Sequence, residues 1–259
     1  MSLVRAKKSL GQHFLKDQNI ARKIVDSLKA ENISTVVEIG PGMGVLTQYL
    51  LQRENITTIP VEIDQESVAY LHAAYPQLKS NLVQGDFLEL DLKTISSDKM
   101  AVIGNFPYNI SSQIFFRVIE NRTQVEEVVC MVQKEVAQRI ACKPGTKEYG
   151  ILSVLLQAYY HIDYLFTVHE NVFSPPPKVK SGVIRLVRNT TEHLECDESL
   201  FFKVVKATFN QRRKVISNSV KGLTPNINKD HLLLSKRPEQ LSVNDFVELT
   251  NLVSSSLKK

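Results

Sequence analysis

The sequence predicts an α/β fold, in which helices cover both faces of a mostly parallel sheet, followed by a small, all-helical C-terminal domain. Short apolar segments alternate with amphipathic segments from residue 20 to residue 141, which is typical of strands wound by helices. Beyond Asn189 this alternation stops, and two longer helical patterns follow. We therefore expect one boundary near residue 190, with domains at 1–190 and 191–259.

Each expected element rests on the spacing of its apolar residues. Strands are expected at residues 35–39, 57–63, 81–84, 100–103, 125–132 and 183–187. Helices are expected at residues 20–30, 65–74, 113–120, 135–141, 151–160, 200–221 and 244–257, and another begins at Val45. Ser111 or Ser112 should cap the helix over 113–120, because a serine hydroxyl can accept a hydrogen bond from the backbone of the first turn.

Four unusual features stand at the ends of predicted strands. They are the glycine turn Gly40–Gly44, Glu62, Asp86 and the segment Asn105–Tyr108. The carboxyl ends of parallel strands share one edge of the sheet, and ligands bind in the crevice beyond that edge. One cleft should therefore hold all four features.

Composition narrows the class of protein. The chain has 259 residues, of which 43% are hydrophobic and 23% charged, as in ordinary globular proteins. Cys130, Cys142 and Cys196 are too irregularly spaced for a disulfide framework or a zinc site, so no metal is expected. No apolar stretch approaches the ~20 residues that span a bilayer, and no apolar core of a signal peptide follows the basic start. We expect a cytoplasmic protein without membrane contact.

Positive charge is concentrated towards the two ends of the sequence. The formal net charge is +5, but residues 1–23 carry a surplus of +5 and residues 180–259 a surplus of +6, around a middle region, 24–179, of −6. Basic flanks around an acidic centre suit a protein that grips a polyanion such as RNA. Simple solubility charge is the alternative. In the first interpretation, residues 1–19 form a basic N-terminal arm.

The glycine turn predicts a ligand that approaches the backbone closely. Gly40, Gly42 and Gly44 connect a strand to a helix, but Val45 stands where the dinucleotide fingerprint would have its third glycine. No phosphate-binding lysine follows, and Glu62 adds a carboxylate instead. An acidic site favours a cationic nucleoside such as S-adenosylmethionine, with Glu62 accepting from its ribose hydroxyls. The alternative is a tight turn beside a solvated glutamate.

Two further acidic residues belong to this predicted site. Glu38 precedes the glycine turn and adds negative charge to it. Asp86 follows a glycine at the end of the third strand and could accept from the adenine amino group of the cofactor. A lone aspartate is more often a helix cap, so the position at the strand end is what favours binding.

The segment Asn105–Tyr108 is the most specific signal in the chain. The side-chain oxygen of Asn105 and the carbonyl of Phe106 could accept from the N–H groups of an adenine amine and aim its lone pair at a methyl donor. Pro107 would fix the turn, and Tyr108 would stack on the flipped base. No strong base is needed, since positioning supplies most of the catalysis. An Asn-Pro turn with a core tyrosine is the alternative.

With these motifs placed, the chain resembles the Rossmann-like class I methyltransferases, and most closely the bacterial small-subunit rRNA adenine dimethyltransferases, the KsgA family. The resemblance rests on segments 8–15, 38–44, 61–64, 84–86, 105–108, 172–181 and 209–214. It implies transfer of four methyl groups from S-adenosylmethionine to N6 of two adjacent adenosines near the 3′ end of 16S rRNA. The partner it implies is the 30S subunit or its precursor, with a role in small-subunit biogenesis, and a monomer is expected.

The resemblance also implies roles for individual residues. Cofactor contacts are implied for His13, Leu15, Gly40, Gly42, Glu62, Asp86 and Asn105. A clamp on the target base is implied for Tyr108 and Phe173, and such stacking contributes ~1–3 kcal/mol per base. The alternative for Phe173 is a core residue. This chain has His13 where the family often has Asn, and Phe106 where it often has Leu or Ile.

Three consecutive cations, Arg212, Arg213 and Lys214, fall on the helix expected over 200–221. Their spacing spreads them over a wide arc, which suits contact with several phosphates, although charge runs are usually solvated faces. The N-terminal arm is expected to order only when cofactor or RNA binds.

Two other functions remain open at this point. The related 23S rRNA adenine methyltransferases, which confer antibiotic resistance, share the glycine turn and the Asn-x-Pro-Tyr segment, but the segment 209–214 favours the small-subunit branch. A non-catalytic RNA-binding assembly factor on the same fold is the second alternative. The intact residues Glu62, Asn105, Pro107 and Tyr108 argue against it.

Overall fold

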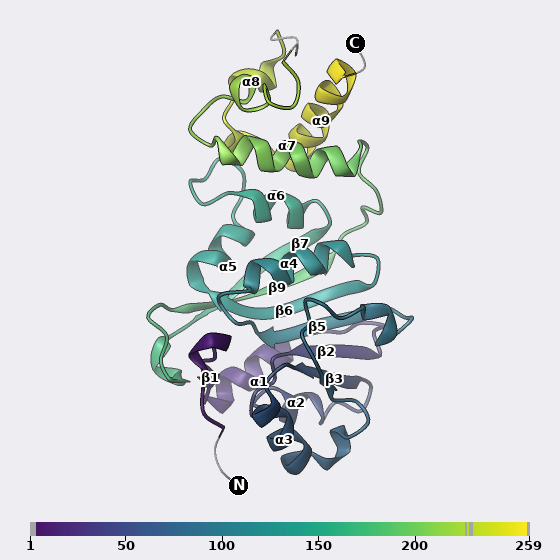
Figure 1. Cartoon of the computed structure of the whole chain (residues 1–259), viewed down its shortest axis with the longest axis vertical. Helices are drawn as coiled ribbons and strands as arrows, with labels where there is room; N and C mark the ends of the chain where they lie inside the picture. The colour runs from purple at the N-terminus through teal and green to yellow at the C-terminus, as the bar shows by residue number, and fades with distance from the viewer. Residues whose placement is uncertain (1–3, 226, 228–229, 258–259) are drawn as a thin grey trace. The chain divides into compact units, whose positions relative to one another are not determined.

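The computed structural model describes residues 4–225, 227 and 230–257 (Figure 1). The first three residues of the predicted basic arm lie outside these described residues. The strands are β1 (Phe14–Leu15), β2 (Thr35–Ile39), β3 (Thr57–Glu62), β4 (Val83–Gln84), β5 (Met100–Asn105), β6 (Val125–Gln133), β7 (Tyr160–Val168), β8 (Phe173–Ser174) and β9 (Ser181–Arg188).

The helices alternate with these strands in the first half of the chain. The α-helices are α1 (Gln18–Ser27), α2 (Thr47–Leu50), α3 (Gln65–Ala74), α4 (Ser111–Glu120), α5 (Lys134–Ala141), α6 (Ile151–Gln157), α7 (Glu198–Asn210), α8 (Ile216–Ser219) and α9 (Val243–Leu257). Short 3-10 helices are η1 (Lys8–Leu10), η2 (Pro76–Leu78), η3 (Leu92–Thr94), η4 (Glu170–Val172), η5 (Leu232–Ser235) and η6 (Pro238–Gln240).

Seven strands form one sheet in the order β4-β3-β2-β5-β6-β9-β7. The strands from β4 to β6 run parallel to their neighbours, and β9 pairs antiparallel with β6. The central strand β2 is buried along its whole length, as expected where helices cover both faces of a parallel sheet. Every strand that the sequence predicted belongs to this sheet, and β2 and α3 have the predicted bounds.

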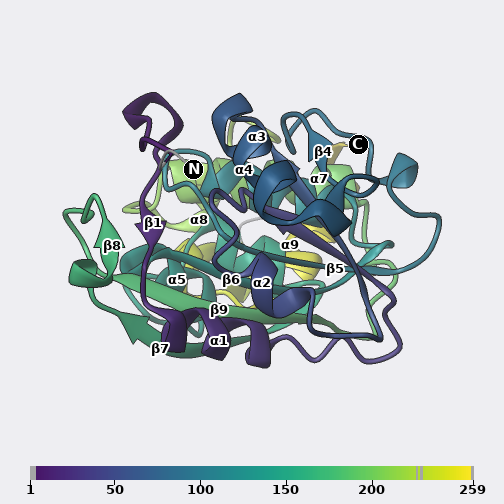
Figure 2. The same cartoon turned by 90° about the horizontal axis from the view of Figure 1, so that it is seen from below.

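A second, two-stranded sheet joins the N-terminal arm to the proline-rich segment. In this sheet β1 pairs antiparallel with β8, so that Leu15 lies opposite Phe173 (Figure 2). The backbone of Lys16 extends the contact by donating to the carbonyl of Val172 at 2.8 Å. Two segments that are about 160 residues apart in the sequence are therefore held side by side.

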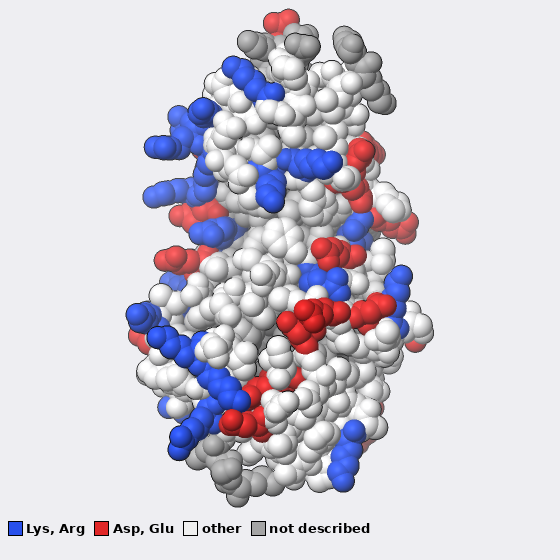
Figure 3. Space-filling view, in the orientation of Figure 1, with Lys and Arg blue, Asp and Glu red and all other residues white. Residues whose placement is uncertain are grey.

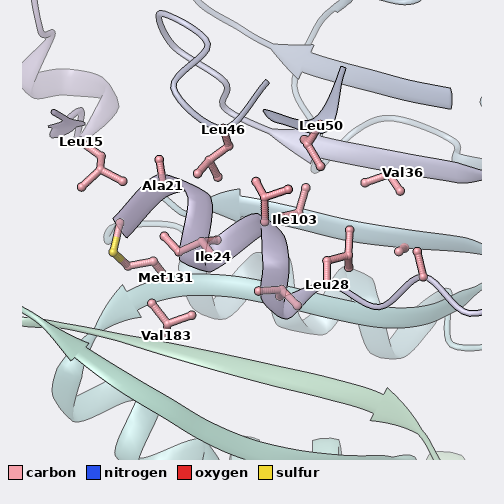
Figure 4. Packing of buried hydrophobic residues seen from close by; sticks show 14 of the residues in the cluster. Leu15, Ala21, Ile24, Leu28, Val36, Leu46, Leu50, Ile103, Met131 and Val183 are labelled. Atoms are coloured by element: carbon pink, nitrogen blue, oxygen red, sulfur yellow. The ribbon is translucent and has the colours of Figure 1, made fainter. Parts of the chain in front are cut away.

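The core under the sheet edge is built around α1 (Figure 4). Asp17 begins this helix by accepting hydrogen bonds from the backbone of Asn19 and Ile20. Ala21 and Ile24 are fully buried among strand residues of the same cluster, which contains Ile103 and Met131 of the central strands. This packing fixes the strands whose carboxyl ends carry the predicted site.

The helices expected over 151–160 and 113–120 are among those whose bounds differ in the structure. The helix expected over 151–160 stops at Gln157, and the chain continues as β7, a strand that the sequence pattern did not reveal. The helix expected to begin with a serine cap instead has Ile110 at its N-cap without a side-chain hydrogen bond. Ser111 is the first helical residue, and its hydroxyl donates to the carbonyl of Tyr108 at 3.2 Å.

The helix expected over 200–221 is interrupted. It ends at Asn210 as α7, a turn follows, and α8 begins at Ile216. In the turn, Arg212 extends its guanidinium to the backbone carbonyl of Lys147. The contact joins this turn to the segment 138–161 of the chain.

The chain divides into two compact units. We call the first the sheet unit, Met1–Ala137 with Ile162–Arg188, and the second the helical unit, Gln138–His161 with Asn189–Lys259. The chain passes between the two units three times. One passage, at 188/189, lies near the boundary expected at residue 190. The other two, at 137/138 and 161/162, arise because 138–161 belongs to the helical unit. There Tyr149 is buried with its ring 6.2 Å from that of Phe209, which stacks on Phe246.

Candidate active site

A pocket opens at the carboxyl edge of the parallel strands. It is lined by Leu10–Phe14, Ile39, Gly40, Gly42, Val61–Ile63, Gly85–Phe87, Asn105–Tyr108 and Ile110. The space they surround, counted together with the open solvent at its mouth, is about 710 Å³. The structure therefore brings the glycine turn, Glu62, Asp86 and the Asn105–Tyr108 segment together, and adds the arm as a further wall.

The glycine turn leaves open space beside one of its residues. Gly40 has a φ of +62°, and a side-chain carbon added there would meet no atom within 4 Å. At Gly42 such a carbon would lie 2.8 Å from the ring of Phe14, and at Gly44 it would lie 2.5 Å from the ring of Tyr75. Packing therefore requires Gly42 and Gly44, whereas Gly40 keeps the backbone accessible to a ligand.

Two backbone donors orient the carboxylate of Glu62. It ends β3 and is only 3% exposed. Its Oε2 accepts from the backbone of Gly42 at 3.0 Å, and its Oε1 accepts from the backbone of Asp64 at 2.9 Å. Burial raises the pKa of Glu62 despite these hydrogen bonds. Each oxygen retains a second lone pair, so the carboxylate could accept from two adjacent hydroxyl groups.

The other two acidic residues differ from each other. Glu38 is buried beside Thr47, whose hydroxyl donates to it at 2.6 Å, and burial raises the pKa of Glu38 to about 8. Most of it is therefore neutral at pH 7, so it contributes less charge than the sequence suggested. Asp86 lines the pocket and also accepts from the backbone of Leu88 at 2.9 Å. Asp86 thus makes a local turn contact and borders the ligand space as well.

Asn105 ends β5 with a fixed amide orientation. Its Nδ2 donates to the backbone carbonyl of His13 at 2.9 Å. The planar amide then turns Oδ1 away from that carbonyl, and among the described residues none donates to Oδ1. Phe106 next to it buries its ring against Phe115, at 5.9 Å between centroids, so only its backbone can take part in chemistry. Two acceptors are thus available at this turn, the Oδ1 of Asn105 and the carbonyl of Phe106.

Tyr108 is held by contacts with two distant segments. Its hydroxyl lies 2.6 Å from that of Ser181 at the start of β9, and its ring centroid lies 5.6 Å from that of His13. Burial raises the pKa of the Tyr108 phenol, which therefore stays protonated at neutral pH. Pro107 precedes it in the wall of the pocket. The segment presents a neutral aromatic group beside the two acceptors.

The resemblance implied roles for His13, Leu15 and Phe173, and the structure gives these three residues different surroundings. His13 lines the pocket, and its Nδ1 donates to the carbonyl of Pro175 at 2.8 Å. The side chain of Leu15 is buried and borders a smaller hollow next to Glu38. Phe173 is 1% exposed within the core cluster and does not line the pocket. The structure does not bring Phe173 opposite Tyr108, and its role as a clamp stays a prediction.

The N-terminal arm makes an ion pair that the sequence pattern did not reveal. The Nζ of Lys7 contacts the carboxylate of Asp64, the N-cap of α3, and lies 3.1 Å from that of Glu66. Burial would raise the pKa of Asp64, but hydrogen bonds from Lys7 and Ser67 outweigh it and hold the pKa below its ordinary value. From Lys7 onwards, this pair holds the arm against the start of α3, whereas its ordering by cofactor or RNA stays a prediction. In the sequence, the feature that could have indicated this ion pair is the acidic residue Asp64, two positions after Glu62 of the predicted site.

The three predicted RNA-binding cations lie in the turn between α7 and α8, not on a helix. Arg212 is half-buried, donates to the carbonyl of Lys147, and lies 3.9 Å from the carboxylate of Glu239. Arg213 and Lys214 are exposed. Lys and Arg side chains gather along one edge of the helical unit in Figure 3. The turn offers two free cations and one that is tied to its own unit.

The described residues contain neither a membrane-spanning helix nor a metal-binding cluster. No helix in this part of the chain is long and apolar enough to cross a membrane. No group of three or more His, Cys, Asp or Glu side chains there is arranged to hold a metal ion.

The sequence matches the ribosomal RNA adenine dimethylase family over residues 3–255. The chain belongs to this family. Its relatives include the ribosomal RNA small subunit methyltransferase A of Cytophaga hutchinsonii, which is 59% identical over 256 residues, covering 98% of this chain and 99% of that protein. The protein of the same name from Bacteroides thetaiotaomicron is 54% identical over 264 residues, covering 100% and 97%. Membership confirms the predicted resemblance and the predicted enzyme class, an rRNA methyltransferase that uses S-adenosylmethionine.

Solved structures confirm the predicted fold class. A dimethyladenosine transferase from Plasmodium falciparum superposes with a TM-score of 0.78 at 23% identity, covering 94% of this chain and 98% of that one. The 23S rRNA methyltransferase ErmE superposes with a TM-score of 0.66 at 24% identity, covering 92% and 99%. At these identities the likeness concerns the fold alone, so it does not decide between the two rRNA substrates.

The pocket of this adenine dimethylase family member fits the family's methyl donor. Gly40 provides open space at the backbone, Glu62 offers two oriented acceptors, and Asp86 stands at the neighbouring strand end. S-adenosylmethionine carries ribose hydroxyls and an adenine amine that suit the acceptors of Glu62 and Asp86, and its positive charge suits an acidic site.

Proposed function

We propose that this chain transfers methyl groups from S-adenosylmethionine to N6 of two adjacent adenosines near the 3′ end of 16S rRNA. The substrate particle is the 30S subunit or its precursor, and both adenosines become dimethylated. The strongest support is the fixed amide of Asn105, whose Oδ1 and the neighbouring carbonyl of Phe106 offer two acceptors at the mouth of the same pocket as Gly40 and Glu62.

The cofactor-binding residues act by position. The bound S-adenosylmethionine supplies an electrophilic methyl group. Glu62 accepts from the two ribose hydroxyls, and Asp86 accepts from the adenine amine. Gly40 allows the backbone to approach closely, and His13 and Leu15 close the arm side of the site. Because both oxygens of Glu62 are already oriented by backbone donors, little reorganisation is needed on binding.

Asn105 and Phe106 orient the target amine. The lone pair of adenine N6 is delocalised into the ring, so acceptors that bind its N–H groups pull the nitrogen towards tetrahedral geometry. Asn105 Oδ1 and the Phe106 carbonyl would do this and would hold the amine facing the methyl group that bound S-adenosylmethionine supplies. No side chain has to act as a strong base, since the alkylated nitrogen becomes acidic as its positive charge develops. Pro107 keeps the Phe106 carbonyl exposed.

Tyr108 supplies one stacking face for the flipped adenine. Phe173 supplies the second in this proposal, which requires its side chain to leave the core when RNA binds. Arg213 and Lys214 contact phosphates of the rRNA, and Arg212 supports them from within the helical unit. We infer that the enzyme works in the cytoplasm as a monomer and serves small-subunit biogenesis.

The test is methyl transfer to 30S particles isolated from a strain that lacks this protein. Labelled S-adenosylmethionine should deliver about four methyl groups per particle, and primer extension should stop at two adjacent adenosines near the 3′ end of 16S rRNA. Particles from the parent strain, already methylated, are the control. Labelled 23S rRNA instead would favour the antibiotic-resistance type of enzyme. Particle binding without transfer would favour a non-catalytic assembly factor.

A further inference from the structure

His13 touches both segments that would hold the target adenosine. Its ring centroid lies 5.6 Å from that of Tyr108 with 30° between the planes, its Nδ1 donates to the carbonyl of Pro175, and its own carbonyl accepts from Asn105. We propose that the imidazole of His13 is a positioning residue for the target base, in addition to bordering the cofactor pocket. This inference rests on the proposed function.

The contacts of His13 belong to a closed ring of interactions. From His13 the ring passes through Pro175 to Ser181, whose hydroxyl meets that of Tyr108 at 2.6 Å, and Tyr108 returns to His13 through the aromatic contact. All members lie in the sheet unit. The proline-rich segment is thereby held at both ends, at Pro175 by His13 and at Ser181 by Tyr108. Removal of the imidazole opens this ring at two places at once.

The two interactions of the imidazole make different chemical demands. A carbonyl oxygen only accepts, so Nδ1 must carry the proton in the contact with Pro175. The contact with Tyr108 needs a flat aromatic ring, which limits rotation of a side chain otherwise anchored through its hydroxyl. An asparagine can donate but has no ring, whereas a phenylalanine has a ring but cannot donate. The two roles of His13 can therefore be separated by substitution.

The kinetic test compares His13→Ala, His13→Asn and His13→Phe. With saturating cofactor and undermethylated 30S particles, His13→Ala should lower kcat by at least about tenfold, and the other two variants should recover part of it. The Kd for S-adenosylmethionine, measured by calorimetry, separates this loss from weaker cofactor binding, because kcat is measured at saturating cofactor. A loss confined to that Kd, with kcat unchanged, would make His13 a cofactor ligand only and overturn the proposal. Wild-type kcat in all three variants would overturn it as well.

A second measurement does not depend on activity. In protein labelled with ¹³C-tyrosine, the ring resonance of Tyr108, assigned with Tyr108→Phe, should shift in His13→Asn and stay close to wild type in His13→Phe. Ser181→Ala removes the other anchor of Tyr108, so the double variant His13→Asn/Ser181→Ala should lose more kcat than the product of the two single losses. The proposal would be contradicted if the Tyr108 resonance did not move in His13→Asn. It would also be contradicted if the kcat loss of the double variant equalled the product of the two single losses. If the wild-type protein transfers no methyl group, the proposed function fails instead, and the resonance still reports the contact.

Discussion

The amide nitrogen of Asn105 donates to the carbonyl oxygen of His13 at 2.9 Å, so the end of a central strand and the N-terminal arm share one hydrogen bond. The bond decides which end of the amide remains available as an acceptor. In the proposed function it also makes the arm part of the catalytic geometry, because a shift of His13 would let the amide rotate.

Asn105→Asp should lower the rate of methyl transfer by about 10²–10³-fold. The new carboxylate could still accept from an amine, but it cannot donate to the His13 carbonyl, and two acceptors would then face each other. Asn105→Ala should lose a similar factor. Transfer of labelled methyl groups gives the rate, and filter binding should show affinity for 30S particles within about threefold of wild type. Loss of particle binding would mean that Asn105 is structural.

Glu38→Gln should change the pH dependence of stability. The carboxyl has an ordinary pKa of 4.5 and a pKa of about 8 in the folded protein, because burial disfavours its charged form. Below pH 4.5 it is neutral in both states, whereas from there to pH 8 the unfolded chain ionises and the folded chain does not. The wild type should therefore lose stability relative to Glu38→Gln as pH rises, by at most about 1.4 kcal/mol per unit.

Urea unfolding of both proteins at pH 5, 6, 7 and 8 measures this difference. The amide oxygen of glutamine can still accept from Thr47, so the hydrogen bond at 2.6 Å has a replacement. Parallel stability curves for the two proteins would show that Glu38 ionises in the fold as readily as in the unfolded chain.

Arg213→Ala/Lys214→Ala should weaken binding to 30S particles and reduce the slope of log K against log salt by about one for each rRNA phosphate that these cations neutralise. Both side chains are exposed, so the fold should be unaffected. Lys79→Ala, an exposed cation of the sheet unit, is the matched control and should leave the slope unchanged. An unaltered slope in the double variant would remove this turn from the RNA interface.

Arg212→Ala should behave differently from its two neighbours. Its guanidinium is engaged with the backbone of Lys147 and with Glu239, so its removal should lower Tm and leave the salt slope close to wild type. Thermal unfolding and the same binding titrations distinguish these effects. A lower slope with an unchanged Tm would assign Arg212 to the RNA instead.

Lys7→Ala should release the arm from the sheet unit, and Lys7→Arg should retain it. The pair with Asp64 should persist at neutral pH, because the pKa of Asp64 is held below its ordinary value of 3.8, and it should be lost as pH falls through that lowered value. Hydrogen exchange of residues 8–13 should be faster in Lys7→Ala at pH 7. Equal exchange in both variants would show that other contacts hold the arm.

Local patterns predicted most of the sheet unit. The bounds of β2 and α3 were correct because a run of buried apolar residues and an aspartate cap are visible in the sequence itself. The sequence analysis did not predict β7. Its exposed residues His161 and Asp163 alternate with less exposed ones, but the helix expected over 151–160 overlaps the start of this strand at Tyr160. The short pair β1 and β8 has only two residues on each side, too few for a periodic signal.

The site residues that could be predicted are those that stand at the carboxyl end of a strand. Gly40, Glu62, Asp86 and Asn105 meet in one pocket because the topology of a parallel sheet requires it. The contacts of Lys7 with Asp64 and of Tyr108 with Ser181 join residues 57 and 73 positions apart, and no spacing rule connects them. The burial of Phe173 depends in the same way on a partner strand far along the chain.

The chain enters the helical unit twice, first at Gln138 and again at Asn189. A fragment truncated after residue 190 would thus keep Tyr149 but lack Phe209 and Phe246, exposing an aromatic surface that invites aggregation. Transplanting this unit onto another methyltransferase needs three splice points, at 137/138, 161/162 and 188/189, and recombination at a single point would break its core.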